Sequence, residues 1–175
     1  MIYFDKDDLP LIFKLVGEHY ARQEEIPDYL SERSGIEKLA GIFQGVQQDI
    51  FYPDLTRKAT YLLVQINKGH FFSNGNKRLA LAIAVGFLAV NERQLIFNQD
   101  KDEYRKFVSE LFPLYKTWED HADFSPEEFA LYNLSIIVAD SEKYIDVSSD
   151  HFDALKERVI AFFERNLTDY TELRG

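Results

Sequence analysis

Residues 79–90 restrict the fold of this chain more than any other segment, because this helix-length run contains only Leu, Ala, Ile, Val, Phe and one Gly. A helix that is apolar on all sides cannot lie at a surface, since none of its faces is suited to water. The run predicts a helix over residues 75–91 that passes through the middle of a bundle. It is shorter than the roughly 20 apolar residues of a membrane span.

Apolar residues elsewhere recur with the 3.6-residue period of amphipathic helices. A short extended piece is expected at residues 94–98, and no Pro-, Gly- or Ser-rich linker divides the 175 residues. The sequence therefore predicts an all-α fold, a helical bundle around the central apolar helix, in a single domain. The further helices are expected at residues 9–21, 34–51, 55–68, 101–114, 125–139 and 150–166.

Immediately before the apolar run, residues 70–78 read His-Phe-Phe-Ser-Asn-Gly-Asn-Lys-Arg. Gly75 and Asn76 fall at the expected helix start, where unpaired N–H groups and the positive end of the helix dipole favour an anion. Lys77 and Arg78 are unfavourable at a helix start unless an anion lies beside them. The segment therefore predicts a phosphate site, and His70 is its one residue suited to accept a proton near neutral pH.

The charge distribution supports a small polyanion as ligand. The formal net charge of −10 argues against a nucleic-acid binder or a binder of anionic membranes, because either needs a positive face. Residues 55–91 nevertheless contain no Asp or Glu. The positive charges of this segment are Arg57, Lys58, Lys68, Lys77 and Arg78.

The chain has no cysteine, which excludes disulfides and thiolate metal sites. Its N-terminal residues lack the basic start and long apolar run of a signal peptide. A soluble, cytoplasmic protein is expected.

The pattern His-x-Phe-x-x-Gly-Asn-Lys-Arg, carried by His70, Phe72, Gly75, Asn76, Lys77 and Arg78, resembles the signature of the Fic/Doc (Fido) family. Its Asn-Lys-Arg ending is similar to that of the Doc (death-on-curing) branch. The other branch ends in Asn-Gly-Arg and has a further Arg where this chain has Leu81. The resemblance covers about residues 35–95. It implies a Fido-type bundle, which can include a small β-hairpin flap, with a core of about residues 1–114 and additional helices in about 115–175.

The resemblance also implies roles for the site residues. His70 would be the general base, Asn76 with Gly75 would form an anion hole, and Lys77 with Arg78 would bind the nucleotide. The donor would be ATP or another nucleoside triphosphate. Phe72 would be a packing anchor. Family members usually have Asp or Glu, a magnesium ligand, at the position of Asn74. As an uncharged oxygen donor, Asn74 is a weak candidate ligand for Mg²⁺.

Several functions stay open at this point. The leading expectation is Doc-like phosphorylation of a protein hydroxyl with ATP, by the toxin of a toxin–antitoxin system whose small antitoxin is the partner. One alternative is Fic-type adenylylation of a protein. An alternative of another class is a catalytically degenerate Fido domain that binds a nucleotide or a partner.

Overall fold

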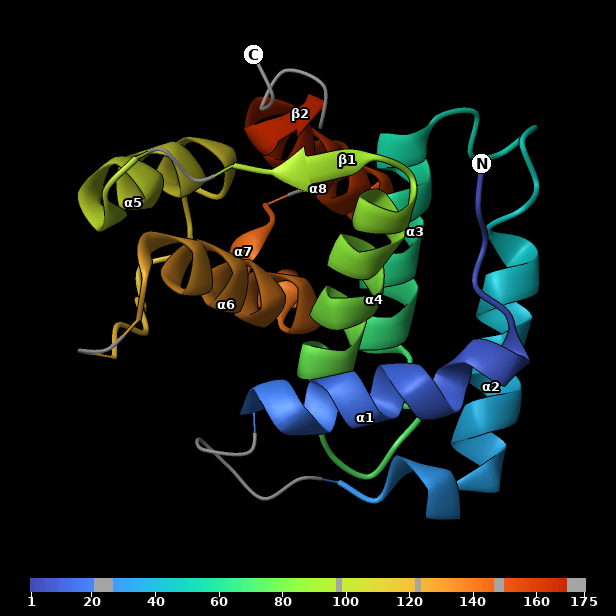
Figure 1. The fold of residues 1–175 in the computed structure, drawn as a ribbon. Helices are drawn as coiled ribbons and strands as arrows, with labels where there is room; N and C mark the ends of the chain where they lie inside the picture. Colours follow the sequence, from blue (N-terminus) through green and yellow to red (C-terminus); the bar gives the residue numbers. More distant parts are fainter. Residues whose placement is uncertain (21–26, 97–98, 122–123, 147–149, 170–175) are drawn as a thin grey trace. The chain divides into compact units, whose positions relative to one another are not determined.

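The computed structural model describes residues 1–20, 27–96, 99–121, 124–146 and 150–169. The chain divides into two compact units, unit 1 with residues 1–91 and unit 2 with residues 92–175. The described residues form eight α-helices and one small two-stranded sheet (Figure 1). The predicted all-α fold is confirmed, whereas the number of domains stays a prediction.

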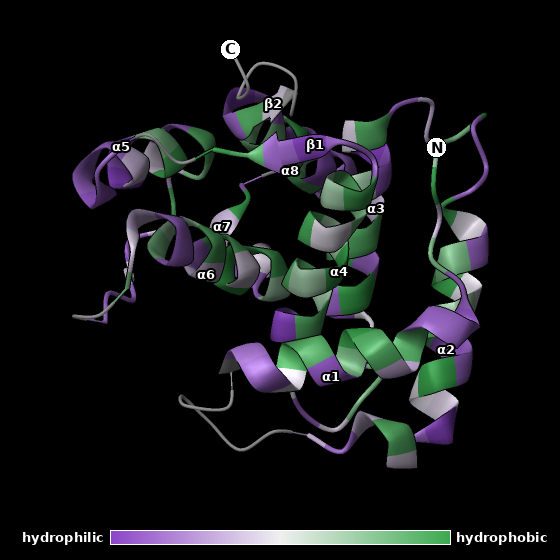
Figure 2. Ribbon diagram, in the orientation of Figure 1, coloured by the Kyte–Doolittle hydropathy of each residue, from purple (hydrophilic) through white to green (hydrophobic). Residues whose placement is uncertain are grey.

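Unit 1 contains the predicted central helix, α4 (Asn76–Val90). Seven of its side chains are buried, and α4 packs along α3 and also contacts α1. Figure 2 shows apolar residues along α4. The other elements of unit 1 are η1 (Lys6–Asp8), α1 (Leu9–Tyr20), η2 (Tyr29–Ser31), α2 (Arg33–Gly45) and α3 (Leu55–Lys68).

The helix expected over residues 34–51 ends earlier, because α2 stops at Gly45. The side chain of Lys58 is fully buried, and its Nζ donates a hydrogen bond to the main-chain oxygen of Val46 across 2.8 Å. Because the Val46 carbonyl accepts a hydrogen bond from Lys58 of α3, it does not continue the helical hydrogen bonding of α2. Ile50, which lies within the range expected for that helix, is consequently 87% exposed in the connecting loop.

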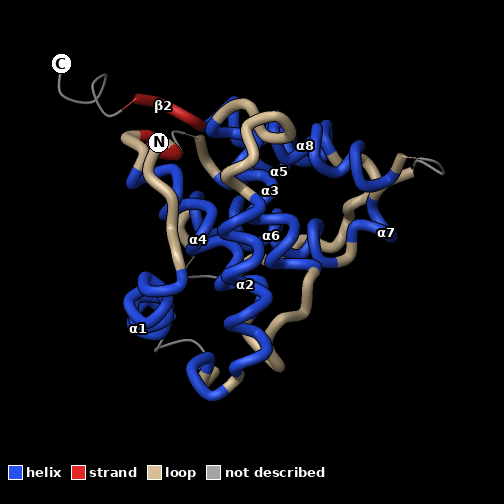
Figure 3. The backbone as a smooth tube through the Cα atoms, turned by 90° about the vertical axis from the view of Figure 1, so that its right-hand side faces the viewer, coloured by secondary structure: helices blue, strands red, loops and turns tan. Residues whose placement is uncertain are grey.

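Unit 2 consists of β1 (Arg93–Leu95), α5 (Lys101–Leu111), α6 (Pro126–Ala139), α7 (Ser141–Tyr144), α8 (His151–Asn166) and β2 (Leu167–Asp169). β1 and β2 are antiparallel, with Gln94 opposite Thr168. The strands are red in Figure 3. The extended piece expected at residues 94–98 is confirmed at residues 94–95, while β1 ends before residue 96 and residues 97–98 lie outside the described residues.

The helix expected over residues 101–114 is too long, because α5 ends at Leu111. Pro113 explains this end, since a proline disfavours helical backbone in the residue that precedes it. Beyond it, the side chain of Asn133 on α6 holds the chain in place. Its Oδ1 accepts hydrogen bonds from the Tyr115 hydroxyl at 2.6 Å and from the Glu119 N–H at 3.0 Å.

No helix within the described residues combines the length and the apolar character that crossing a membrane requires.

Candidate functional site

Residues 69–75, called here the motif loop, join α3 to α4 in unit 1. Gly69 is the C-cap of α3, as its sequence position indicates, but its φ of −74° is ordinary helical backbone. The left-handed turn falls on His70, with φ of 46°. Left-handed backbone costs a residue with a Cβ about 1–2 kcal/mol. The candidate base therefore sits, exposed to solvent, in a conformation that the surrounding loop imposes on it.

Asn76, the first residue of α4, closes the motif loop with its side chain. Its Oδ1 accepts a hydrogen bond from the Phe72 N–H at 3.0 Å, and its Nδ2 donates to the Phe72 oxygen at 2.6 Å. An amide bonded at both ends fixes the position of the peptide that it contacts. Asn76 thus shapes the loop, and its role in an anion hole stays a prediction.

Gly75 is the N-cap of α4 and has left-handed backbone with φ of 75°. A Cβ at this position would collide with the Tyr29 hydroxyl and would lie 2.8 Å from Pro27 Cγ. The Tyr29 hydroxyl also donates a hydrogen bond to the Gly75 oxygen across 3.1 Å. Both the conformation and the available space therefore require glycine here.

The first turn of α4 is suited to an anion. Gly75 provides no side-chain cap, and the turn contains no acidic residue. It contains Lys77, which is exposed, and Arg78, which is partly buried. Positive side chains at the positive end of a helix are unfavourable by themselves, and a bound phosphate would reverse the sign of this interaction.

Phe72 is 3% exposed and anchors the motif loop in a cluster of three rings. Its ring lies edge-on to Phe13 of α1, with centroids 5.7 Å apart, and to Tyr29 of η2, with centroids 5.0 Å apart. Phe13 and Tyr29 stack on each other at 4.9 Å. Sequence reasoning identified Phe72 but missed its two partners, because nothing in their spacing relates residues 13 and 29 to the motif.

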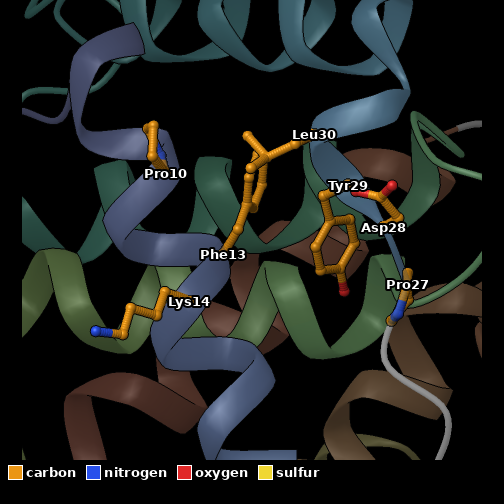
Figure 4. Close-up of a pocket in the computed structure, with 7 residues that line it drawn as sticks. All are labelled: Pro10, Phe13, Lys14, Pro27, Asp28, Tyr29 and Leu30. Carbon is orange, nitrogen blue, oxygen red and sulfur yellow. The ribbon is translucent and has the colours of Figure 1, made fainter.

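A cavity of about 210 Å³ lies beside this cluster (Figure 4). Phe13 and Tyr29 form part of its wall, but none of its lining residues belongs to the motif loop or to the first turn of α4. The cavity is therefore separate from the predicted phosphate position. It is lined by Pro10, Phe13, Lys14, Pro27, Asp28, Tyr29 and Leu30.

Glu32, a third residue that sequence reasoning missed, contacts the motif loop from the N-cap position of α2. Its Oε2 accepts a hydrogen bond from the Ser73 N–H at 2.8 Å, and its Oε1 accepts one from the Ser73 hydroxyl at 2.7 Å. The two residues are 41 positions apart in the chain. No local pattern could have paired them.

Asn74, the weak candidate for a magnesium ligand, is exposed, and its Oδ1 accepts a hydrogen bond from the Gly75 N–H at 2.6 Å. Within the described ranges, no group of three or more His, Cys, Asp or Glu side chains could hold a metal ion. The Asn74 side chain thus offers a metal one neutral oxygen, which already accepts one hydrogen bond.

The structure brings His70, Phe72, Asn74 and Gly75 together in the motif loop, with Asn76, Lys77 and Arg78 on the adjoining first turn of α4. The model of the Fic/DOC family matches residues 6–88, which are almost all of unit 1. No curated protein and no solved structure gives a significant match. Residues 6–88 are therefore similar to the Fic/DOC family, whose members generally carry out nucleotide-dependent modification of other proteins.

Proposed function

We propose that this protein transfers the γ-phosphate of ATP to a hydroxyl group of a protein target, as a Doc-like protein kinase. The observation that carries the proposal is the start of α4. This helix start has a glycine N-cap, which provides no capping side chain. Its first turn has two positive side chains and no acidic residue. The positive end of the helix dipole and the two positive side chains all favour a nucleotide phosphate at this position.

His70 serves as the general base in this proposal. It takes the proton of the target hydroxyl, whose oxygen forms a bond to the γ-phosphorus while the bond to the β,γ-bridging oxygen breaks and ADP leaves. Lys77 and Arg78 neutralise the phosphates, with Arg78 able to contact two phosphate oxygens at once. Rate enhancement then comes from positioning and charge stabilisation, which dominate phosphoryl transfer.

Leu81 favours phosphorylation over adenylylation. The adenylylating branch of the family has an additional Arg at this position, which helps to hold the outer phosphates for AMP transfer. Leu81 is 7% exposed and has no charged group to offer. Adenylylation is therefore the second candidate, and the two reactions differ in which phosphorus of ATP ends on the target.

Mg²⁺ fits this site only as a companion of the nucleotide. Asn74 offers a neutral oxygen, and Mg²⁺ prefers carboxylates, phosphates and water. We propose that ATP phosphates and water provide most of the ligands, with Asn74 as the one contact from the motif loop. When bound, the ion would neutralise charge on the phosphates.

Asn74 also favours a candidate of another class, a Fido-type module that binds nucleotide without transferring any part of it. An enzyme that lost its acidic magnesium ligand could retain the anion site at α4. ATP binding with no transfer to any protein, in the wild type and in Asn74→Asp alike, would support this candidate.

A toxin role with a small antitoxin partner is the biological setting that we propose for the kinase. Expression of the wild-type chain in bacteria should then stop growth, and His70→Ala should relieve the arrest. If bacteria that produce the active enzyme grow normally, the toxin role is contradicted. The kinase proposal is not affected by that result.

The experiment that tests the function uses a bacterial lysate with α-labelled and γ-labelled ATP in parallel. We expect label on protein from the γ position only, lost in His70→Ala and retained in His19→Ala, which changes an exposed histidine of α1. Label from the α position would replace phosphorylation by adenylylation. Absence of label from both, with ATP binding intact, would exclude the kinase and favour the binding module.

A further inference from the structure

Within the described residues, Glu32 provides the one carboxylate with a hydrogen bond to the motif loop, and it makes two, both with Ser73. The residue lies directly after η2, which carries Tyr29. An acidic group beside a predicted phosphate site is unexpected on electrostatic grounds, because it repels the ligand. Its position therefore requires a structural explanation.

Glu32 does not cap its own helix. It occupies the N-cap position of α2, but its side chain makes no capping hydrogen bond there. A carboxylate at this position commonly accepts a hydrogen bond from an N–H of the first helical turn. In this protein both carboxylate oxygens accept hydrogen bonds from Ser73 instead. Glu32 therefore stabilises the motif loop and leaves α2 without a side-chain cap.

Together with Glu32, two further side chains make hydrogen bonds to the backbone of the motif loop. Asn76 fixes the Phe72 peptide, Glu32 fixes the N–H and hydroxyl of Ser73, and Tyr29 fixes the Gly75 oxygen. A loop held at three points before a ligand arrives loses little conformational entropy when it binds. The N–H groups at the start of α4 are then already oriented.

We infer that Glu32 is a positioning residue for the phosphate site, which acts through Ser73 and has no contact with the nucleotide. The inference rests on the proposed function, since it assigns the part that Glu32 plays in the same site. Two donors from Ser73 offset the negative charge of the carboxylate, so that its cost to an incoming phosphate is reduced. What the site requires from residue 32 is the pair of hydrogen bonds.

Glu32→Gln separates the hydrogen bonds from the charge. The glutamine oxygen can accept from the Ser73 N–H, and its NH₂ group can donate to the Ser73 hydroxyl oxygen, so both bonds survive without charge. Glu32→Ala removes both. Glu37→Ala is the matched control, because Glu37 also lies on α2 and its side chain, 67% exposed, pairs with Lys6 and not with the motif loop.

The test is the dissociation constant of ATP, measured by calorimetry at a temperature at which circular dichroism shows every variant fully folded. We expect Glu32→Ala to weaken ATP binding about tenfold, because the motif loop must then be ordered when ATP binds. Glu32→Gln should stay within about threefold of the wild type, and Glu37→Ala should bind like the wild type. The amide proton signal of Ser73 should shift in Glu32→Ala and not in Glu37→Ala.

Two outcomes would overturn the inference alone. One is wild-type affinity in Glu32→Ala, which would mean that the contact stabilises the fold without positioning the site. The other is equally weak binding in Glu32→Gln and Glu32→Ala, which would make the charge the essential property. Failure of the wild type to bind ATP would instead contradict the proposed function. If Glu32→Ala does not fold, Ser73→Ala with Ser34→Ala as control provides the same comparison, with about a threefold loss expected for one hydrogen bond.

Discussion

The hydroxyl group of Tyr29 donates a hydrogen bond to the main-chain oxygen of Gly75 across 3.1 Å, and it occupies the space that a Cβ at residue 75 would need. One side chain thus both requires glycine at the start of α4 and holds that glycine in place. Through this contact, η2 supports the predicted phosphate site. Tyr29 therefore influences the conformation of Gly75, although the two residues are far apart in the sequence.

Tyr29→Phe should keep the ring contacts with Phe13 and Phe72 and lose the hydrogen bond to Gly75. We expect the free energy of unfolding to fall by about 1 kcal/mol, because a buried carbonyl loses one of its donors. Urea denaturation measures the change. Tyr3→Phe is the control, since the recorded ring contacts of Tyr3 are with Phe87 and Lys58. An equal loss in both variants would contradict this role of the hydroxyl.

Gly75→Ala should destabilise the protein by more than about 1 kcal/mol, since the new Cβ meets both left-handed backbone and the Tyr29 hydroxyl. Gly41→Ala is the matched control within α2, where an added Cβ has no neighbour within 4 Å. It should stabilise the protein by up to about 1 kcal/mol, because alanine favours helix. Thermal unfolding of the two variants should therefore change in opposite directions. A similar change in both would show that the described environment of Gly75 has no influence.

His70→Gly should be more stable than His70→Ala by about 1 kcal/mol, because glycine adopts a φ of 46° without the cost that a Cβ imposes. Both variants should lack transfer activity. Glu92→Gly provides the comparison, since Glu92 has a φ of 62° and lies outside the matched family segment. That variant should gain stability and retain transfer activity. Equal stability of His70→Gly and His70→Ala would contradict strain at His70.

The ion pair between Asp49 and Lys58 predicts that part of the protein's stability is lost at acidic pH. A hydrogen bond from Lys58, together with its charge, holds the pKa of Asp49 below its ordinary value of 3.8. The unfolded chain therefore binds this proton more readily than the folded chain. The resulting stability is present above the unfolded pKa and is lost as the pH falls through the folded pKa. Asp49→Asn should unfold with a weaker dependence on pH below about 4 than the wild type. An unchanged dependence would contradict the pairing.

Asn74→Asp should raise the Mg²⁺-dependent rate of transfer about tenfold or more, because a carboxylate replaces a neutral oxygen donor beside the phosphates. The rate is measured against Mg²⁺ concentration at saturating ATP. Asn91→Asp, at the C-cap of α4, changes charge at the opposite end of the same helix and should not increase the rate. A rate that stays unchanged in Asn74→Asp would indicate that the motif loop does not contact the ion.

The sequence predicted those parts of the fold that depend on local periodicity. The all-apolar run placed α4 correctly, and helix 55–68 agrees with α3 (Leu55–Lys68). The prediction for residues 34–51 was too long because α2 ends where Lys58 of α3 donates a hydrogen bond to Val46, the C-cap of α2. Local periodicity does not reveal such a contact. In the site, the motif residues could be identified because they are contiguous. Tyr29 and Glu32 could not, since their contacts with the motif form only when the chain folds.

Phosphate binding at the start of α4 is the central claim, and a titration of isotopically labelled protein with ATP, followed through its backbone amide signals, tests it most directly. The account predicts that the amides of residues 75–78 shift with saturating ATP, and that these shifts are lost in the double variant Lys77→Ala and Arg78→Ala. Saturable shifts confined to residues outside the motif loop and the first turn of α4, or no shifts at millimolar ATP, would contradict it.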